Sequence, residues 1–141
     1  MNALVDTSVW SLALRRKPNA LTVAEQSIVD ELADLTREGR ARIIGLIRQE
    51  LLSGIRTAAQ YKKLCLALRA FPDELIGTAD YEAAAKAGND CRCKGIVASV
   101  VDALICQVAL ARQWSIFTTD PDFKAYASVL PIKLHSVRAG K

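Results

Sequence analysis

Four acidic residues stand at positions in the sequence where carboxylates could do chemistry. Asp6 and Asp120 each directly follow a short apolar run, and Glu50 lies a few residues past a third one. Asp102 has apolar neighbours on both sides, where an ionised carboxylate is costly unless it is paired or bound to a metal. Carboxylate oxygens are the ligands preferred by Mg²⁺ and Mn²⁺, and such sites hydrolyse phosphodiesters. The residue types therefore indicate metal-dependent phosphodiester hydrolysis.

Three further polar residues flank these acids. Asp122 lies two residues past Asp120 and is interpreted either as an accessory metal ligand or as a turn residue. Ser8 and Thr118 could orient a ligand or water through their hydroxyls, although Ser8 also suits a plain helix cap. Asp102 carries the same alternative, because aspartate is favoured at helix starts and a capping residue can also face a cleft.

The elements that must position these residues follow from the hydrophobic pattern. A capping box, Thr22-x-x-Glu25, predicts the start of a helix that ends near Gly39. The remaining helices follow from apolar residues at helical spacing. Strands are expected at 3–5, 41–46, 75–77, 114–119 and 130–137, and helices at 7–14, 22–37, 47–54, 57–70, 78–94, 102–112 and 121–126.

Strands that alternate with helices imply an α/β fold with a mainly parallel sheet. Ligand sites in such sheets form beyond the carboxyl ends of the strands. Asp6, Glu50 and Asp120 would then lie at one edge of the sheet, and the cost of burying Asp102 argues that it joins them.

Composition restricts the class of protein. The 141 residues are 51% hydrophobic and carry a net charge of +4, which fits one domain spanning 1–141 and permits a polyanionic partner. The tight basic groups at 15–17 and 62–63 are typical of solvated helix faces. The four cysteines lack zinc-ligand spacing and are expected to be free thiols, and His135 is expected to be an ordinary strand residue. We expect a soluble cytoplasmic protein without a membrane span.

Four segments, in order along the chain, resemble the motifs of PIN-domain proteins of the VapC toxin type. They are residues 4–10 (LVDTSVW), 49–54 (QELLSG), 94–96 with 101–105 (KGI and VDALI), and 118–123 (TTDPDF). Each motif is weak alone, but the set spans residues 4 to about 137 in the order expected of that family.

The resemblance implies a PIN-like α/β/α sandwich and a Mg²⁺- or Mn²⁺-dependent endoribonuclease, a hydrolase. It assigns the metal site to Asp6, Glu50, Asp102 and Asp120, with Asp102 and Asp6 as the most direct ligands. It also implies the toxin of a VapBC-type toxin–antitoxin pair, with RNA as substrate, an inhibitory antitoxin as partner and a homodimer as the usual assembly.

Two other classes of function remain open. A receiver-like phospho-acceptor domain also has a Mg²⁺ pocket at strand ends, but it needs a second acid beside Asp6, where Thr7 stands, and a lysine after Thr118-Thr119, which is absent. A catalytically silent RNA-binding PIN domain is the second alternative. Apolar helix residues near the expected cleft are candidates for antitoxin or dimer contacts if any are exposed: Trp10, Leu12, Leu14, Leu51 and Leu52.

Overall fold

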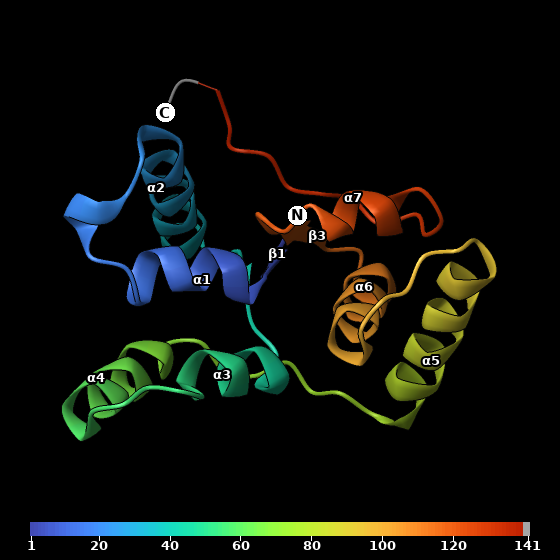
Figure 1. The fold of residues 1–141 in the computed structure, drawn as a ribbon, viewed down its shortest axis with the longest axis horizontal. Coiled ribbons are helices and arrows are strands. Elements are labelled where there is room, and N and C mark those ends of the chain that lie inside the picture. Colours follow the sequence, from blue (N-terminus) through green and yellow to red (C-terminus); the bar gives the residue numbers. More distant parts are fainter. Residues whose placement is uncertain (140–141) are drawn as a thin grey trace.

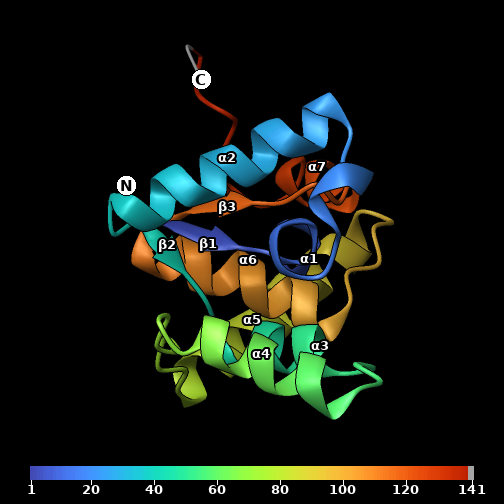
Figure 2. The same cartoon turned by 90° about the vertical axis from the view of Figure 1, so that its left-hand side faces the viewer.

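A computed structural model describes residues 1–139 and contains a small parallel sheet at its centre. The central strand β1 (Ala3–Val5) lies between β2 (Ala41–Arg42) and β3 (Ser115–Phe117), in the order β2-β1-β3 (Figure 2). Ala3 pairs with Ala41 on one side and with Ser115 on the other. Every residue of β1 is fully buried, as expected for a parallel strand covered on both faces.

Helices cover the two faces of this sheet. Figures 1 and 2 show α2 on one face and α6 on the other, with α5 packed outside α6. The helices of residues 1–139 are α1 (Thr7–Leu14), α2 (Val23–Arg37), α3 (Gly45–Leu52), α4 (Ala58–Leu68), α5 (Thr78–Cys93), α6 (Val100–Arg112) and α7 (Asp122–Ala127), with a 3₁₀ turn at Pro18–Ala20. The α/β class with helices on both faces of a parallel sheet is confirmed.

Helix ends follow their capping chemistry. The hydroxyl of Thr22 accepts from the backbone N–H of Glu25, whose carboxylate accepts from the N–H of Thr22, so the predicted capping box is present. Ser99 caps α6 by accepting from the backbone N–H of Asp102. Asp102 is therefore in the first turn of α6 and does not cap the helix, which leaves its carboxylate available for other contacts.

The strands are shorter than the apolar runs that predict them. β2 ends at Arg42, and α3 begins at Gly45. The prediction of a strand that reaches residue 46 is therefore wrong beyond Ile43. Ile43, Ile44 and Ile47 are all fully buried, because the strand end and the first helical turn face the same core. A continuous apolar run does not distinguish these two conformations.

Two other predicted strands are reduced to single bridges. The segment 75–77 is not a strand, and the contact lies earlier, where Ile43 bridges Asp73. In the segment 130–137, Ile116 bridges Leu134 through backbone bonds of 2.8 Å to the carbonyl of Lys133 and from the N–H of His135. This segment lies at the edge of the sheet, as Pro131 predicts.

No helix within residues 1–139 combines the length and the apolar character that a membrane crossing requires. Cys65, Cys91, Cys93 and Cys106 are free thiols, as predicted.

Candidate metal centre

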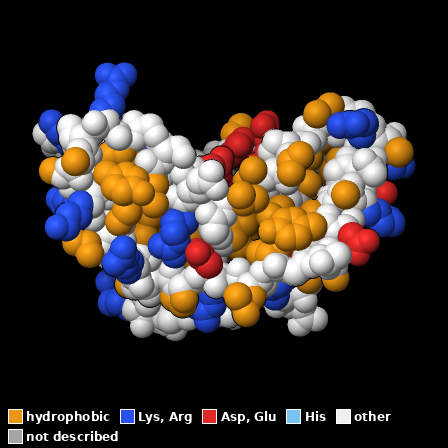
Figure 3. Space-filling view, turned by 90° about the horizontal axis from the view of Figure 1, so that it is seen from below, with side chains coloured by type: hydrophobic (Ala, Val, Ile, Leu, Met, Phe, Trp, Pro, Cys, Tyr) orange, Lys and Arg blue, Asp and Glu red, His pale blue; other side chains and the backbone are white. Residues whose placement is uncertain are grey.

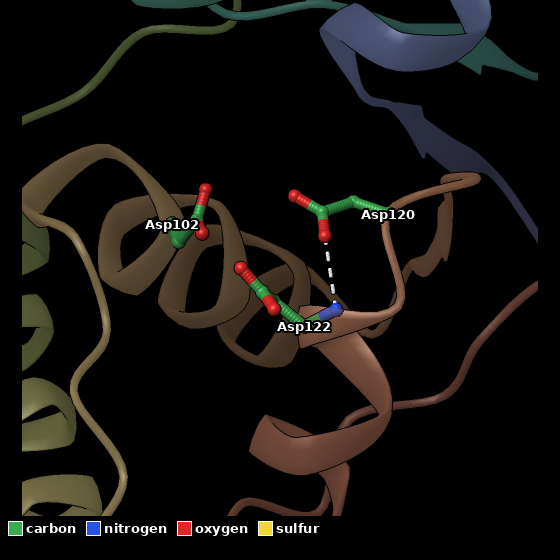
Figure 4. Close-up of side chains that lie close together, drawn as sticks. All are labelled: Asp102, Asp120 and Asp122. Atoms are coloured by element: carbon green, nitrogen blue, oxygen red, sulfur yellow. Dashed lines mark hydrogen bonds between the residues drawn. The ribbon is translucent and has the colours of Figure 1, made fainter.

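Three carboxylates come together where α6 begins and β3 ends. One oxygen each of Asp102, Asp120 and Asp122 lies within 4.8 Å of the others. Figure 4 shows the side chains of Asp120 and Asp122 directed toward Asp102 across the space between the loop and α6. Asp102 belongs to the first turn of α6, Asp120 to the loop after β3, and Asp122 is the first residue of α7.

Asp6 lies next to this group and is held by two hydroxyls. It is only 7% exposed, and its Oδ2 accepts hydrogen bonds of 2.8 Å from both Ser8 Oγ and Thr118 Oγ1. The two hydroxyl oxygens are 3.3 Å apart. Ser8 and Thr118 therefore orient the Asp6 carboxylate; that they orient a ligand or water stays a prediction.

The same hydroxyls fix the loop that carries the other acids. The backbone N–H of Thr119 donates to Ser8 Oγ and that of Asp120 donates to Thr118 Oγ1, both at 3.0 Å. The backbone N–H of Asp122 donates in turn to Asp120 Oδ1 at 2.9 Å, the bond drawn in Figure 4. The loop conformation is thus set by local bonds that point one oxygen of Asp120 toward the start of α7.

Asp102 is positioned by a tyrosine from α7. The hydroxyl of Tyr126 donates to Asp102 Oδ2 over 2.6 Å, and Tyr126 is 3% exposed. Burial raises the pKa of the Asp102 carboxyl; the Tyr126 bond opposes this shift, and the negative charges of Asp6 and Asp120 add to it. Burial and the bond to Asp102 also raise the pKa of the Tyr126 phenol, which therefore remains a proton donor.

Within residues 1–139, the acids of this group have no cationic side chain as a partner. Among the ion pairs formed by residues 1–139, none includes Asp6, Asp102, Asp120 or Asp122. Carboxylates that repel one another need a positive charge to remain ionised together. A set of oxygen ligands without nitrogen or sulfur suits a hard divalent cation such as Mg²⁺ or Mn²⁺.

Glu50 occupies the rim of the site. It is exposed, lies in the second half of α3 and not at its start, and accepts a 2.9 Å hydrogen bond from Thr7 Oγ1. This bond ties α3 to the residue that follows Asp6. In the described chain, Glu50 and Asp6 lie outside the compact three-acid set, whereas Asp122, predicted as an accessory, lies within it.

Sequence reasoning missed Tyr126. Its signal is the spacing: Tyr126 follows Asp122 by one helical turn, so both side chains are on the same side of α7. His135 lies apart from the acids, with Nε2 2.6 Å from the buried carboxylate of Glu31, where it holds the last segment against α2.

The fold and the motifs define a known class: the chain belongs to the PIN domain family, whose model matches residues 3–129. No curated protein sequence matches it. Solved structures with this fold include VapBC2 from Rickettsia felis bound to a promoter DNA fragment, at 17% identity over 96% of this chain and 98% of that one, with a TM-score of 0.73. FitAcB from Neisseria gonorrhoeae matches at 20% identity, over 95% and 96% of the two chains, with a TM-score of 0.67.

A toxin–antitoxin complex from Klebsiella pneumoniae has the same fold, at 17% identity over 86% of this chain and 90% of that chain, with a TM-score of 0.63. At these identities the likeness shows the fold alone.

Proposed function

We propose that this chain is a Mg²⁺- or Mn²⁺-dependent endoribonuclease and the toxin of a VapBC-type toxin–antitoxin pair. The observation that carries the proposal is the cluster of Asp102, Asp120 and Asp122 beside the oriented carboxylate of Asp6. PIN domains are in general nucleases, and an anionic site without a cationic partner fits the metal on which such nucleases depend.

The residues divide into ligands and supports. Asp102, Asp120, Asp122 and Asp6 would hold the cation, which when bound supplies a Lewis acid that activates water and stabilises charge on the phosphate. Tyr126 occupies Oδ2 of Asp102, so Oδ1 is the oxygen left to face the site. Ser8 and Thr118 hold the Asp6 carboxylate in place by donating to its Oδ2. Glu50, held by Thr7, would act at the rim.

The antitoxin partner is part of the proposal, because the Klebsiella pneumoniae structure of this fold is a toxin–antitoxin complex. Of the apolar residues considered for such contacts, Trp10, Leu12 and Leu51 are buried in the core, whereas Leu14 is 37% exposed and Leu52 is half-buried. The last two are the ones left for an antitoxin or a second copy. The homodimer and the single domain over 1–141 remain predictions.

The test is cleavage of a mixed RNA pool in Mg²⁺ or Mn²⁺, comparing wild type with Asp102→Asn and Asp6→Asn. Replacing a ligand should lower the rate by at least ~100-fold, since losing even an outer-shell partner of a metal site costs up to about that much. Glu82→Gln, which removes an exposed acid of α5, is the matched control and should cleave normally.

Undiminished cleavage by both aspartate variants would refute the metal-site assignment. RNA binding without cleavage by the wild type would favour the silent RNA-binding alternative. The family match removes the basis for the receiver alternative, which requires a different fold.

A further inference from the structure

A cleft lined by cations lies between the end of α1 and the start of α4. Its volume is about 580 Å³. We call this cleft the basic cleft. The charged residues in its lining are Arg15, Arg16, Arg56 and Lys63, and no carboxylate of residues 1–139 lines it. The local sequence does not indicate this grouping, because Arg15 and Arg16, which follow α1, precede Arg56 by about 40 positions and Lys63 by almost 50.

The charge of the basic cleft is largely uncompensated. Arg15, Arg56 and Lys63 are exposed, and in residues 1–139 their side chains form no ion pair or hydrogen bond. Arg16 differs, since its Nη2 lies 3.6 Å from Glu25 Oε1. Surface cations without partners are common singly, but three that line one concave surface create a field that attracts a polyanion.

The basic cleft adjoins a second hollow that reaches the residues around Asp6. This second hollow shares Arg15 and Arg16 with the basic cleft and is also lined by Ser8, Thr119 and Glu25, the acid that pairs with Arg16. Ser8 is one of the two residues that donate to Asp6, and the backbone N–H of Thr119 donates to Ser8. The two hollows therefore lead from the cations toward the residues that hold Asp6.

The distribution of charged side chains on the surface agrees with this arrangement. Figure 3 shows acidic side chains in the notch between the two halves of the molecule, and basic side chains gathered on the half that carries α1 and α4. A nucleic acid approaching the notch alone meets carboxylates, which repel its phosphates. Cations beside the notch offset that repulsion.

We propose that the basic cleft holds the phosphates of single-stranded RNA on one side of the cleavage point, with Arg15, Arg56 and Lys63 as the contacts. This inference rests on the proposed function, because it assigns the strand path of the same site. RNA is favoured over an acidic peptide because the second hollow reaches Ser8, which donates to Asp6 of the site that would act on a phosphodiester.

The test measures binding of a fluorescent 12-nucleotide single-stranded RNA in EDTA, which separates binding from cleavage. The full-length protein with Arg15→Gln, Arg56→Gln and Lys63→Gln combined is compared with wild type across 50–300 mM salt. The matched control removes three equally exposed, unpaired cations elsewhere, through Lys62→Gln, Lys94→Gln and Lys133→Gln. Because all six side chains are exposed, both variants should fold like wild type, which circular dichroism checks.

The cleft variant should bind at least about tenfold more weakly at 50 mM salt, and the slope of log affinity against log salt should become shallower by about 2, since each single-strand phosphate contact contributes about 0.7. The control should change either value far less. Equal loss in both variants would overturn the proposal, since binding would then follow net charge only.

A glutamate-rich peptide with the same net charge as the RNA tests the alternative occupant of the cleft, an acidic peptide. If the peptide binds more tightly than the RNA, and the cleft variant loses the peptide but keeps the RNA, the cleft is a peptide site and the proposal fails. Cleavage by wild type in Mn²⁺ is scored separately. Normal cleavage with an unchanged salt slope in the cleft variant would refute the strand path and leave the proposed function standing. If wild type does not cleave RNA but the cleft variant binds it more weakly, the proposed function would be refuted and the strand path would stand.

Discussion

The two ends of α6 hold carboxylates in opposite electrostatic states. At its C-terminal end Arg112 donates to Glu74 Oε2 at 2.7 Å and to both oxygens of Asp80 at 2.8 and 3.1 Å. At its N-terminal end Asp102 faces Asp120 and Asp122 and forms no ion pair with any cation in residues 1–139. The guanidinium holds the pKa of Asp80 down at about 2, whereas burial raises that of Asp102.

The difference separates a structural cluster from a functional one. Pairing at the Arg112 end fastens α6 to the start of α5 and to the segment before it, so the charges stabilise the fold. Unpaired carboxylates at the Asp102 end cost stability, and their repulsion is relieved only by a ligand. Each prediction below tests one side of this contrast.

The largest expected effect is stabilisation by metal at the Asp102 end. Because a ligand that binds only the folded state stabilises it by mass action, Mn²⁺ at about 100 times its dissociation constant should add ~2.7 kcal/mol to the free energy of unfolding. Thermal unfolding with and without MnCl₂ measures this. Asp102→Asn should lose most of the response and Arg112→Gln should keep it; a response of equal size in both would remove the contrast.

The second effect concerns the Arg112 end. Arg112→Gln leaves two partly buried carboxylates without their cation, and the free energy of unfolding should fall by about 2 kcal/mol. Urea denaturation at pH 7 measures the change. Arg92→Gln, which removes an exposed arginine of α5 with no ion pair in residues 1–139, should cost far less. Similar losses in the two variants would show that the Arg112 pairs do not stabilise the fold.

The third effect is the pH dependence of the same pairs. Since the folded pKa of Asp80 is depressed, its contribution is fully present above the ordinary aspartate pKa near 4 and is lost as pH falls through about 2. Wild type should exceed Asp80→Asn by about 1 kcal/mol at pH 5, allowing for solvent screening, and this margin should shrink toward pH 2. Urea titrations at pH 5, 4, 3 and 2 give the margin, and a constant value would contradict the assignment.

The smallest effect has the opposite sign. In EDTA, Asp102→Asn should raise the free energy of unfolding by about 0.5 kcal/mol, because it removes a charge repelled by Asp6 and Asp120 while an amide oxygen can still accept from Tyr126. Asp90→Asn, which breaks the Lys86 pair on α5, should give no gain. A loss of stability in Asp102→Asn would mean that the carboxylate contributes to the fold.

The sequence predicted the placement of two acids because topology alone positions them. Asp6 and Asp120 follow parallel strands, so the shared edge of the sheet brings them together whatever the side chains do. The burial cost of Asp102 was also visible from its neighbours. The sequence offered Asp122 only as an accessory or a turn residue and did not indicate Tyr126, because the positions of both depend on the turn after Asp120, where the Asp122 N–H donates to Asp120 Oδ1.

Strand lengths were overestimated for a related reason. Apolar runs report burial, and in this chain burial continues from Ile43 into the first turn of α3. The basic cleft lay beyond sequence reasoning altogether, because Arg15 and Lys63 meet only through the packing of α1 against α3 and of α3 against α4. Long-range packing of this kind has no local signature.

The position of β1 in the sheet has a consequence for synthesis. β1 is translated before β3, yet Asp6 accepts a hydrogen bond from the hydroxyl of Thr118, 112 positions later. Closing so long a loop is slow and gains no strand pairing until β3 exists to pair with β1. A nascent chain therefore has no assembled acidic centre until the segment after β3 has been translated, and a product truncated before residue 118 would lack one permanently.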